Sequence, residues 1–407
     1  MKRFVLTLAA LMSLAPLCRA QFFDFDAPSR SQKPVKFEYD VDFWYYYDNR
    51  EFDTSNNVYY PSGTTHGVLV TPYAGFSVQQ GRNVNHRFML GMELCRIMGA
   101  GETLADVPKE VLAFYDMHAT SKNGKFEAIA GIFPRNFQEA EYTEAIYRGG
   151  LKFGDRNFEG CLLKYANEKF YAEIGLDWMG HKTHDVKEMF QIFSGGRWDA
   201  TDWLRLGWSA SMHHFGGSEI APGVVDEHLL NPYVKMDFGR KIGIQTLSLK
   251  AGALLTYQWN RAYVEDPITR GGGEFVFTLR NWNVCLQNTL YLGENLQPYF
   301  YDHDTSGEMF GSRLYMGNPF YRNKVYDVAE LIWSPRLTDY LSLSLIERVY
   351  CGIMPEGTGT FGIAGNQQIC SLVFDLDKIL NPKRVCGKVG TFKRAKRGAG
   401  LENLFEL

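Results

Sequence analysis

Pairs of hydroxyl and histidine side chains are the residues of this chain that could do covalent chemistry. His213 follows Ser209 and Ser211, and His118 stands two positions before Thr120. A hydrolase needs a nucleophile beside a base, together with a third group that orients the base. In an extended strand His213 and Ser211 lie on one face, so they could meet, but no Asn or Asp is placed to orient the histidine. We therefore expect that the chain is not an enzyme.

Metal and cofactor sites are also poorly supported. Asp302, His303 and Asp304 carry metal-ligand side chains, but three adjacent residues of an extended segment alternate sides and cannot converge on one ion. The cysteines are scattered and form no CxxC motif, which argues against zinc or haem. The glycines of residues 271–273 precede a strand pattern rather than a helix, so they do not form a phosphate-binding loop. We expect no metal and no cofactor.

Charged and apolar residues alternate along many short stretches, and these stretches are the elements that position the polar groups. In Lys169–Met179 the apolar side chains of Phe170, Leu176 and Trp178 fall on one face of a strand, and Asp177 falls on the other. The same pattern recurs in about 16 segments, roughly 14–18 given the usual error in strand limits. The predicted strands are Lys36–Asp48, His66–Gln80, Val84–Met98, Glu110–Ala119, Lys125–Phe133, Phe158–Ala166, Glu168–Met179, Val186–Ser194, Asp202–Phe215, His228–Phe238, Gly243–Tyr257, Gly273–Arg280, Asn283–Leu292, Lys324–Trp333, Tyr340–Tyr350 and Gln367–Asp377.

The gaps between these predicted strands alternate between long and short almost throughout. A transmembrane, antiparallel, up-and-down β-barrel with short turns at one rim and long loops at the other has this asymmetry, whereas a sandwich has no reason for it. We therefore predict an all-β outer-membrane barrel over residues 36–380. An even strand count with a long first gap places both termini in the periplasm. An exported soluble all-β protein is the alternative fold.

The two ends of the chain differ from its body. Residues 1–20 have a basic start, an apolar run and small residues before position 21, which predicts a secretory signal peptide. Residues 21–35 are interpreted as a periplasmic arm, and residues 381–407 as a basic, disordered periplasmic tail. The segment 21–380 carries a net charge of −11, which argues against a nucleic-acid partner and favours cations in a pore.

Several short motifs lie along the predicted barrel: Gly131–Arg135, Gly175–Gly180, Leu290–Glu294, Leu314–Tyr321 and the closing strand that begins Gln367-Gln368. With these motifs the chain resembles the porin-like outer-membrane β-barrel proteins of Bacteroides-type Gram-negative bacteria. The resemblance implies a barrel in the outer membrane and specifies no solute. One departure is the tail that continues past Leu380, because such barrels usually end at the last strand with a terminal aromatic residue.

Two groups of charged residues are the candidate functional residues. In a barrel of this size the polar face of each strand points into the lumen, so one group is expected to line the pore. The long gap Pro134–Asn157 is the third predicted surface loop and could fold inward, so its charged residues are candidates for a constriction; an ordinary surface loop is the alternative. The predicted pore-lining residues are Glu38, Asp40, Asp42, Arg87, Glu93, Lys125, Glu127, Glu173, Asp177, Arg205, Lys235, Asp237, Lys250, Glu274, Arg280 and Asp375, and the predicted constriction residues are Arg135, Glu139, Glu141, Glu144 and Arg148.

The function that follows from this sequence is a porin-like outer-membrane channel for diffusion or binding of small polar solutes. The alternatives are a plugged barrel with a structural or adhesion role, and an outer-membrane hydrolase. The expected partners are outer-membrane lipid and lipopolysaccharide, the barrel assembly machinery and small polar solutes. By analogy with other porins, a homo-oligomer is left open.

Overall fold

The computed structural model describes residues 35–52, 62–101, 103–148, 155–221, 223–261, 266–303, 307, 311–335, 337–338, 340–353 and 361–375. The predicted signal peptide, most of the predicted arm and the basic tail lie outside these residues. The strands are β1 (Lys36–Phe52), β2 (Gly63–Gln80), β3 (Val84–Ile97), β4 (Pro108–Thr120), β5 (Lys125–Pro134), β6 (Asn157–Ala166), β7 (Phe170–Gly180), β8 (Met189–Asp199), β9 (Leu204–Phe215), β10 (Val225–Asp237), β11 (Thr246–Asn260), β12 (Ile268–Asn281), β13 (Val284–Gly293), β14 (Val325–Trp333), β15 (Leu341–Gly352) and β16 (Gly362–Asp375).

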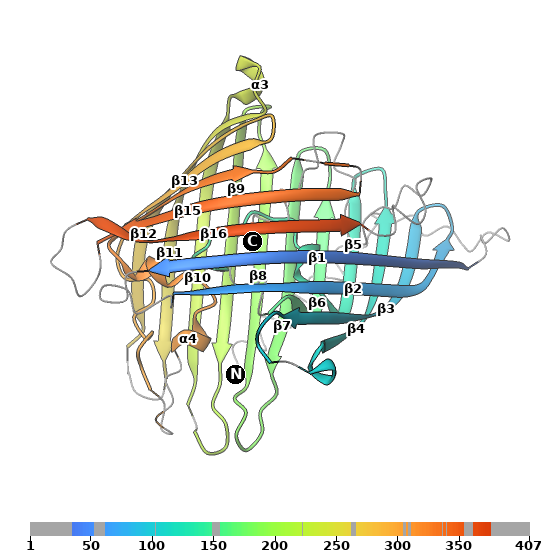
Figure 1. Ribbon diagram of the computed structural model, residues 1–407, viewed down its shortest axis with the longest axis horizontal. Helices are drawn as coiled ribbons and strands as arrows, with labels where there is room; N and C mark the ends of the chain where they lie inside the picture. The colour runs from blue at the N-terminus through green and yellow to red at the C-terminus, as the bar shows by residue number, and fades with distance from the viewer. Residues whose placement is uncertain are drawn as a thin grey trace, which may run out of the picture.

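These strands form one closed barrel in which each strand pairs with its sequence neighbours. All pairs are antiparallel, and β16 pairs with β1 to close the ring, as Figure 1 shows for the red and dark blue strands. The prediction of an up-and-down barrel of 16 strands is confirmed. The described helices are short: η1 (Leu104–Asp106), η2 (Arg135–Phe137), α3 (Gly239–Ile242), α4 (Gly311–Leu314) and η3 (Pro319–Arg322). Among the described residues, none of the helices is long and apolar enough to cross a membrane.

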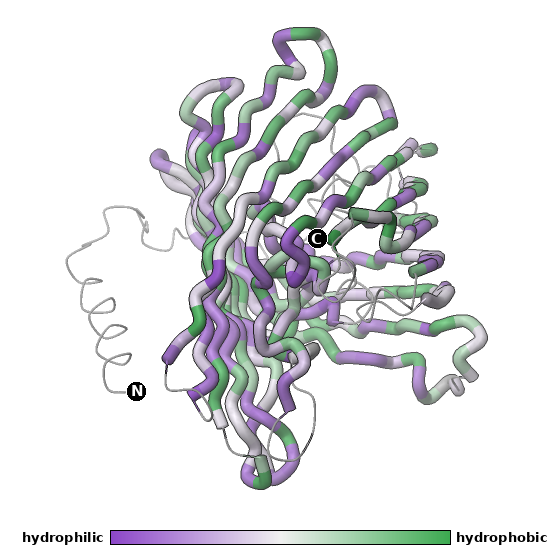
Figure 2. The backbone as a smooth tube through the Cα atoms, turned by 90° about the vertical axis from the view of Figure 1, so that its left-hand side faces the viewer, coloured by the Kyte–Doolittle hydropathy of each residue, from purple (hydrophilic) through white to green (hydrophobic). Residues whose placement is uncertain are grey.

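The two faces of the barrel wall differ in polarity because side chains alternate along each strand. In β7 the buried side chains of Tyr171, Glu173 and Asp177 point inward, whereas Ile174 and Trp178 are exposed on the outer face. Figure 2 shows this alternation as purple and green segments that follow one another along the strands. Large exposed apolar side chains therefore cover the outside, and charged side chains gather inside.

Long and short connections lie at opposite rims of the barrel. The residues between β2 and β3, and between β4 and β5, form turns of three and four residues, whereas 135–156 and 294–324 are long loops. We call these two loops L3 and L7, because they are the third and the seventh of the long connections. The shortest turn joins β12 to β13 and contains Trp282, which has a φ of 54° and is 81% exposed. The first residue of β1 and the last residue of β16 lie at the short-turn rim.

Strands that contain glycine extend further than the sequence predicts. We expected Val186–Ser194, but β8 runs from Met189 to Asp199 through Gly195 and Gly196. Similarly, β12 begins at Ile268 and β16 at Gly362, each before the start that the sequence indicates. Glycine weakens the apolar alternation and is depleted in strands, so these segments look like loops in the sequence.

Closure of the ring predicts a specific disulfide between the first and last strands. Tyr45 is directly opposite Leu372 in the β1–β16 pairing, and Cα atoms of opposed antiparallel residues lie about 4.5–5.5 Å apart, which a disulfide spans. We expect the double variant Tyr45→Cys/Leu372→Cys to form an intramolecular disulfide under mild oxidation, measured by mass spectrometry of peptides. In the control pair Tyr45→Cys/Val373→Cys the second thiol points to the other face, so no bond should form. Equal cross-linking of both pairs would contradict this register.

Candidate functional site

The predicted pore-lining residues occupy inward positions of the strands. The buried ones are Arg87, Glu93, Glu127, Glu173, Asp177, Lys250 and Glu274. Those that remain partly exposed include Glu38, Asp40, Asp42, Arg205, Lys235, Asp237 and Arg280, whereas Lys125 is exposed at the start of β5. Asp375 ends β16 opposite Asp42, and its side chain lies outside the described part of the chain. That these residues line a pore stays a prediction.

Loop L3 folds into the lumen and contacts the wall at successive strands. Its base is fixed by Arg135, whose Nη2 donates hydrogen bonds of 2.6 Å to Asp177 on β7 and 2.6 Å to Asp155. The guanidinium also lies 4.3 Å from the ring centroid of Phe158 on β6. Arg135 is buried and charged, so its removal from water is costly. The two carboxylates offset this cost.

Beyond this base the chain passes along β6, β7 and β8. The amides of Glu139 and Ala140 donate to the carboxylate of Glu173 at 2.9 and 3.3 Å, and Lys164 Nζ lies 3.1 Å from Glu139 Oε1. A Cβ atom at Gly195 on β8 would come within 2.4 Å of the Ala140 Cβ atom. The absence of a side chain at Gly195 is therefore what lets L3 lie against the wall here.

Glu141 connects the middle of L3 to two basic residues on β9 and β10. Its Oε1 lies 2.8 Å from Lys235 Nζ on β10 and 3.2 Å from Arg205 Nη1 on β9. Burial alone would raise the pKa of the Glu141 carboxyl, but Lys235 and Arg205, with Lys250 beyond them, hold this pKa well below its usual range. Glu141 therefore stays ionised at pH values where an ordinary glutamate is partly protonated.

The far end of L3 reaches β12 and β15. Thr143 donates to Glu274 on β12, and Glu144 lies 3.5 Å from Arg348 on β15. Arg348 is also paired with Glu330 of β14 at 3.1 Å. The acidic residues of L3 thus meet basic residues on β6, β9, β10 and β15, and the loop extends across the lumen.

Loop L7 meets L3 through its backbone. The amide of Arg148 donates to the carbonyl of Met316 at 3.0 Å, and the amide of Asn318 donates to the carbonyl of Glu144 at 2.7 Å. A Cβ atom at Gly317 would lie 2.0 Å from the Ala145 carbonyl oxygen, so glycine is required for this approach. The five predicted constriction residues thus lie in a loop that contacts the inner wall and L7, and their role in a constriction stays a prediction.

An apolar cluster surrounds these charged contacts. It combines Phe137, Tyr142 and Ile146 of L3 with Phe320 and Tyr321 of L7 and with inward side chains from most of the wall. Tyr321 also donates to Glu274 at 2.5 Å, beside the Thr143 contact. The loops are held in the lumen by apolar packing as well as by ion pairs.

Four charged residues of this site are absent from our sequence-based set: Asp116, Lys164, Glu330 and Arg348. Lys164 is fully buried and lies 2.9 Å from Glu127. Asp116 is fully buried and binds Arg87 and His118. All four lie at inward positions of their strands.

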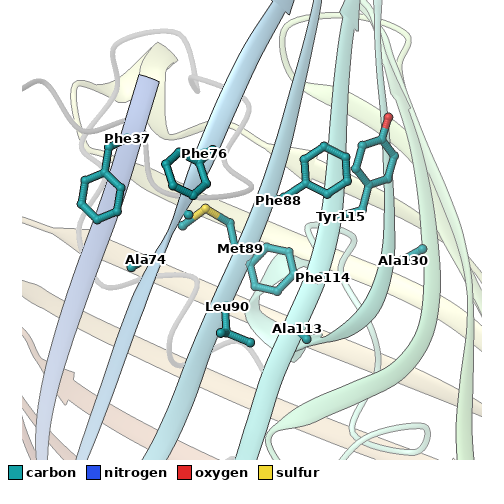
Figure 3. A pocket seen from close by; sticks show the side chains of 11 residues that line it. Phe37, Ala74, Phe76, Phe88, Met89, Leu90, Ala113, Phe114, Tyr115 and Ala130 are labelled. Carbon is teal, nitrogen blue, oxygen red and sulfur yellow. The ribbon is translucent and has the colours of Figure 1, made fainter. Parts of the chain in front are cut away.

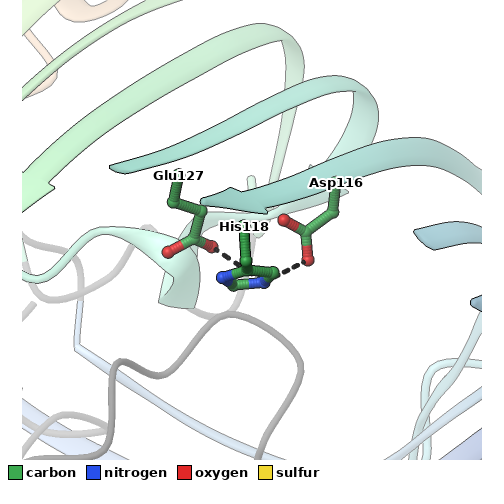
Figure 4. A group of neighbouring side chains, drawn as sticks. All are labelled: Asp116, His118 and Glu127. Carbon is green, nitrogen blue, oxygen red and sulfur yellow. Dashed lines mark hydrogen bonds and ion pairs between the residues drawn. The ribbon is translucent and has the colours of Figure 1, made fainter. Parts of the chain in front are cut away.

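Asp116, His118 and Glu127 offer donor atoms within 4.8 Å of one another, which is the arrangement of a candidate metal site (Figure 4). However, the Arg87 Nη2 lies 3.3 Å from the His118 Nε2, and Lys164 is already paired with Glu127. A divalent cation would have to enter beside two fixed positive charges. We interpret the three residues as a structural group whose negative charges are balanced by Arg87 and Lys164. The expectation of no metal stays a prediction.

The histidine and hydroxyl pairs considered for hydrolysis are engaged differently. His213 donates through Nδ1 to the carbonyl of Leu314 at 2.5 Å, and its Nε2 has no hydrogen-bond partner among the described residues. His118 contacts Asp116 and Arg87. Neither ring nitrogen of His213 is hydrogen-bonded to Ser209 or Ser211 in the described part of the chain, and the expectation that the chain is not an enzyme stays a prediction. Of the acidic and histidine triplet in L7, Asp304 lies outside the described residues.

Comparison with solved structures supports the fold. An outer membrane protein of Vibrio cholerae, OmpT folded in vitro, is 7% identical, with a TM-score of 0.50 over 86% of this chain and 99% of that chain. Its trimer form is 8% identical, with a TM-score of 0.50 over 84% and 99%. Salmonella typhi OmpF in complex with daunomycin is 11% identical over 83% of this chain and 97% of that chain, with a TM-score of 0.46.

Neither a protein family model nor a curated protein sequence matches this chain. At these identities the likeness to solved structures concerns the fold alone. The neighbours are outer-membrane β-barrels, whereas a Bacteroides-type origin is not supported by them.

The contacts of Glu141 predict how L3 responds to a change of charge and pH. Replacing Glu141 with Gln leaves Lys235 and Arg205 without their carboxylate, at a cost of about 1.5–3 kcal/mol, or roughly 10–100-fold in local opening. We expect faster amide hydrogen exchange of residues 138–146 in the detergent-solubilised protein. Because the folded pKa of Glu141 is depressed, its contribution is complete above about pH 4.3 and is lost only as the pH falls well below that value.

Glu219→Gln is the matched control, since Glu219 is an exposed glutamate of another loop. Its substitution should leave exchange in residues 138–146 unchanged. Unchanged exchange in the Glu141→Gln protein, or loosening of the wild-type loop already between pH 6 and 5, would contradict the assigned role of this carboxylate.

Proposed function

We propose that this protein is a porin-like outer-membrane channel that passes small polar solutes through a lumen narrowed by L3. The observation that carries the proposal is the set of ion pairs between the L3 glutamates and the basic residues of the wall. Charged side chains inside a closed barrel need either water or partners of opposite charge. A water-filled pore supplies the water.

The outer surface supports a position in a membrane. Phe170, Leu176 and Leu206 point away from the lumen, and Leu206 is 38% exposed. Exposed apolar side chains are stable on the outside of a barrel when hydrocarbon surrounds it. A closed barrel also leaves no unpaired strand edge, so its backbone polar groups are satisfied inside a membrane. We further propose that the short-turn rim faces the periplasm and that L3 and L7 start from the external rim, as the asymmetry of the loops predicts.

A plugged barrel with a structural role is the second candidate, and one observation favours it. L3 and L7 share an apolar cluster with side chains from most of the wall, so the loops occupy much of the lumen. The two proposals differ in a single measurable property, which is the flow of ions through the purified protein in a planar bilayer. Stepwise currents support the channel, and a sealed bilayer with correctly inserted protein supports the plug.

Displacing L3 from the wall tests whether this loop sets the conductance. Leu at Gly195 would collide with Ala140, so Gly195→Leu should move L3 toward the lumen axis or out of it, at a cost of about 1–3 kcal/mol. We expect single-channel conductance to change from the wild-type value, whereas Gly273→Leu on the outer face, where a Cβ meets its nearest atom at 3.4 Å, should not change it. Identical conductance of both variants and wild type would remove L3 from the permeation path.

The acidic residues at the start of β1 predict the ion preference of the channel. Glu38, Asp40 and Asp42 are inward residues of the short-turn half and remain partly exposed. The triple variant Glu38→Gln/Asp40→Asn/Asp42→Asn removes three negative charges, so the reversal potential in a KCl gradient should shift toward lower cation preference. A preference that stays the same as in the wild type would show that these carboxylates do not face the ion path.

A further inference from the structure

A groove lies on the outer face of β1–β5, in the half of the barrel that is nearer the short-turn rim. It has a volume of about 550 Å³. Phe37, Phe76, Phe88 and Tyr115 stand in a row across four neighbouring strands at one side of it, as Figure 3 shows. Beside the row, Ala74 and Ala113 are exposed to the outside with Leu90 between them, and Ala130 continues the row next to Tyr115.

The shape of this groove follows from side-chain size. The aromatic row is tightly packed, with ring centroids 5.7 Å apart for Phe37 and Phe76 and 4.9 Å apart for Phe88 and Tyr115. Beside the row, the small side chains of Ala74 and Ala113, on either side of Leu90, leave a trough on the surface. A concave apolar surface of this size fits a flexible hydrocarbon chain better than the flat wall of a second barrel.

Polar and basic groups lie at the rim end of the same strands. His86 stacks on Tyr115 and is hydrogen-bonded through its ring nitrogens to Tyr115 at 2.7 Å and to Gln80 at 2.6 Å. The turn between β2 and β3 carries the exposed basic residue Arg82, and the turn between β4 and β5 carries Lys122. These turns adjoin each other, because the amide of Thr120 at the end of β4 donates to the carbonyl of Asn83 at 2.8 Å.

Negative charge is absent from the outward positions of this part of the surface. The outward positions of the described segments 35–43, 72–80, 84–92, 111–119 and 125–132 carry no carboxylate. An apolar trough that ends beside hydrogen-bonding groups and two basic side chains complements a molecule with a hydrocarbon chain and an anionic phosphate.

We propose that this groove binds one glycerophospholipid, with an acyl chain beside the aromatic row and its phosphate near Arg82 and Lys122. The inference rests on the proposed function, because it takes the short-turn rim to face the periplasm. The leaflet on that side then supplies phospholipid to the groove.

The test is native mass spectrometry of the full chain in detergent with added palmitoyl-oleoyl phosphatidylglycerol. The wild type should retain one lipid per chain. Ala113→Phe fills the trough and should reduce retention about tenfold or more, because the loss of even two buried methylene groups changes binding by this order. Ala253→Phe is the control, since Ala253 faces outward on β11, away from the groove, and should leave retention unchanged.

The double variant Arg82→Gln/Lys122→Gln tests the phosphate separately. It should weaken retention of phosphatidylglycerol without changing the trough. Equal retention by Ala113→Phe and the wild type overturns the proposal, and so does a wild type that binds no lipid but forms oligomers which Ala113→Phe disrupts. Conductance of each variant is recorded in parallel: normal channels without lipid retention contradict only the groove, whereas absence of channels contradicts the proposed function.

Discussion

Opposite charges that face each other across the barrel interior fix the position of L3. Glu139, Glu141 and Glu144 project from one loop toward basic side chains that belong to strands far apart in the sequence. Removing a charge from water is costly, and a buried partner left alone would be more costly still. Since each glutamate meets its partner in a different direction, the loop is restrained around the circumference rather than at a single contact.

Close approach of the backbone makes these pairs geometrically possible. Gly195 gives L3 its place against β8, and Gly317 gives L7 its place against Ala145. The apolar side chains around them, such as Phe137 and Ile146, remove water from the contacts and so strengthen the electrostatic attraction there. Small residues, ion pairs and aromatic packing are therefore parts of one arrangement, in which the loss of any of them weakens the others.

Much of this arrangement can be predicted from the sequence, for reasons that particular residues illustrate. The alternation in β7 identifies Glu173 and Asp177 as inward residues because one outer face must be continuously apolar. Lys164 and Arg348 escaped this reasoning because their inward neighbours, such as Leu162 and Tyr350, are themselves apolar and pack under the loops. A strand with two apolar faces gives no indication of which side is the inside.

The partners of L3 could not be predicted in the same way. That Glu141 meets Lys235 depends on the diameter of the barrel and on the path of the loop, which are properties of the closed structure. The groove on the outer face could not be predicted either, since Ala74 and Ala130 are unremarkable in sequence and come to line one groove only through the strand order. Properties of one strand follow from its pattern, whereas properties shared by distant strands require the fold.

The route of L3 has a consequence for the order of assembly. The loop follows β5, yet its farthest ionic partner, Arg348, is on β15, more than 200 residues later in the chain. L3 therefore cannot reach its final position until nearly all of the wall has formed. Glu144 must stay hydrated until then, so the lumen is expected to stay wide at this end of L3 in the last intermediates and to narrow there only when the ring closes.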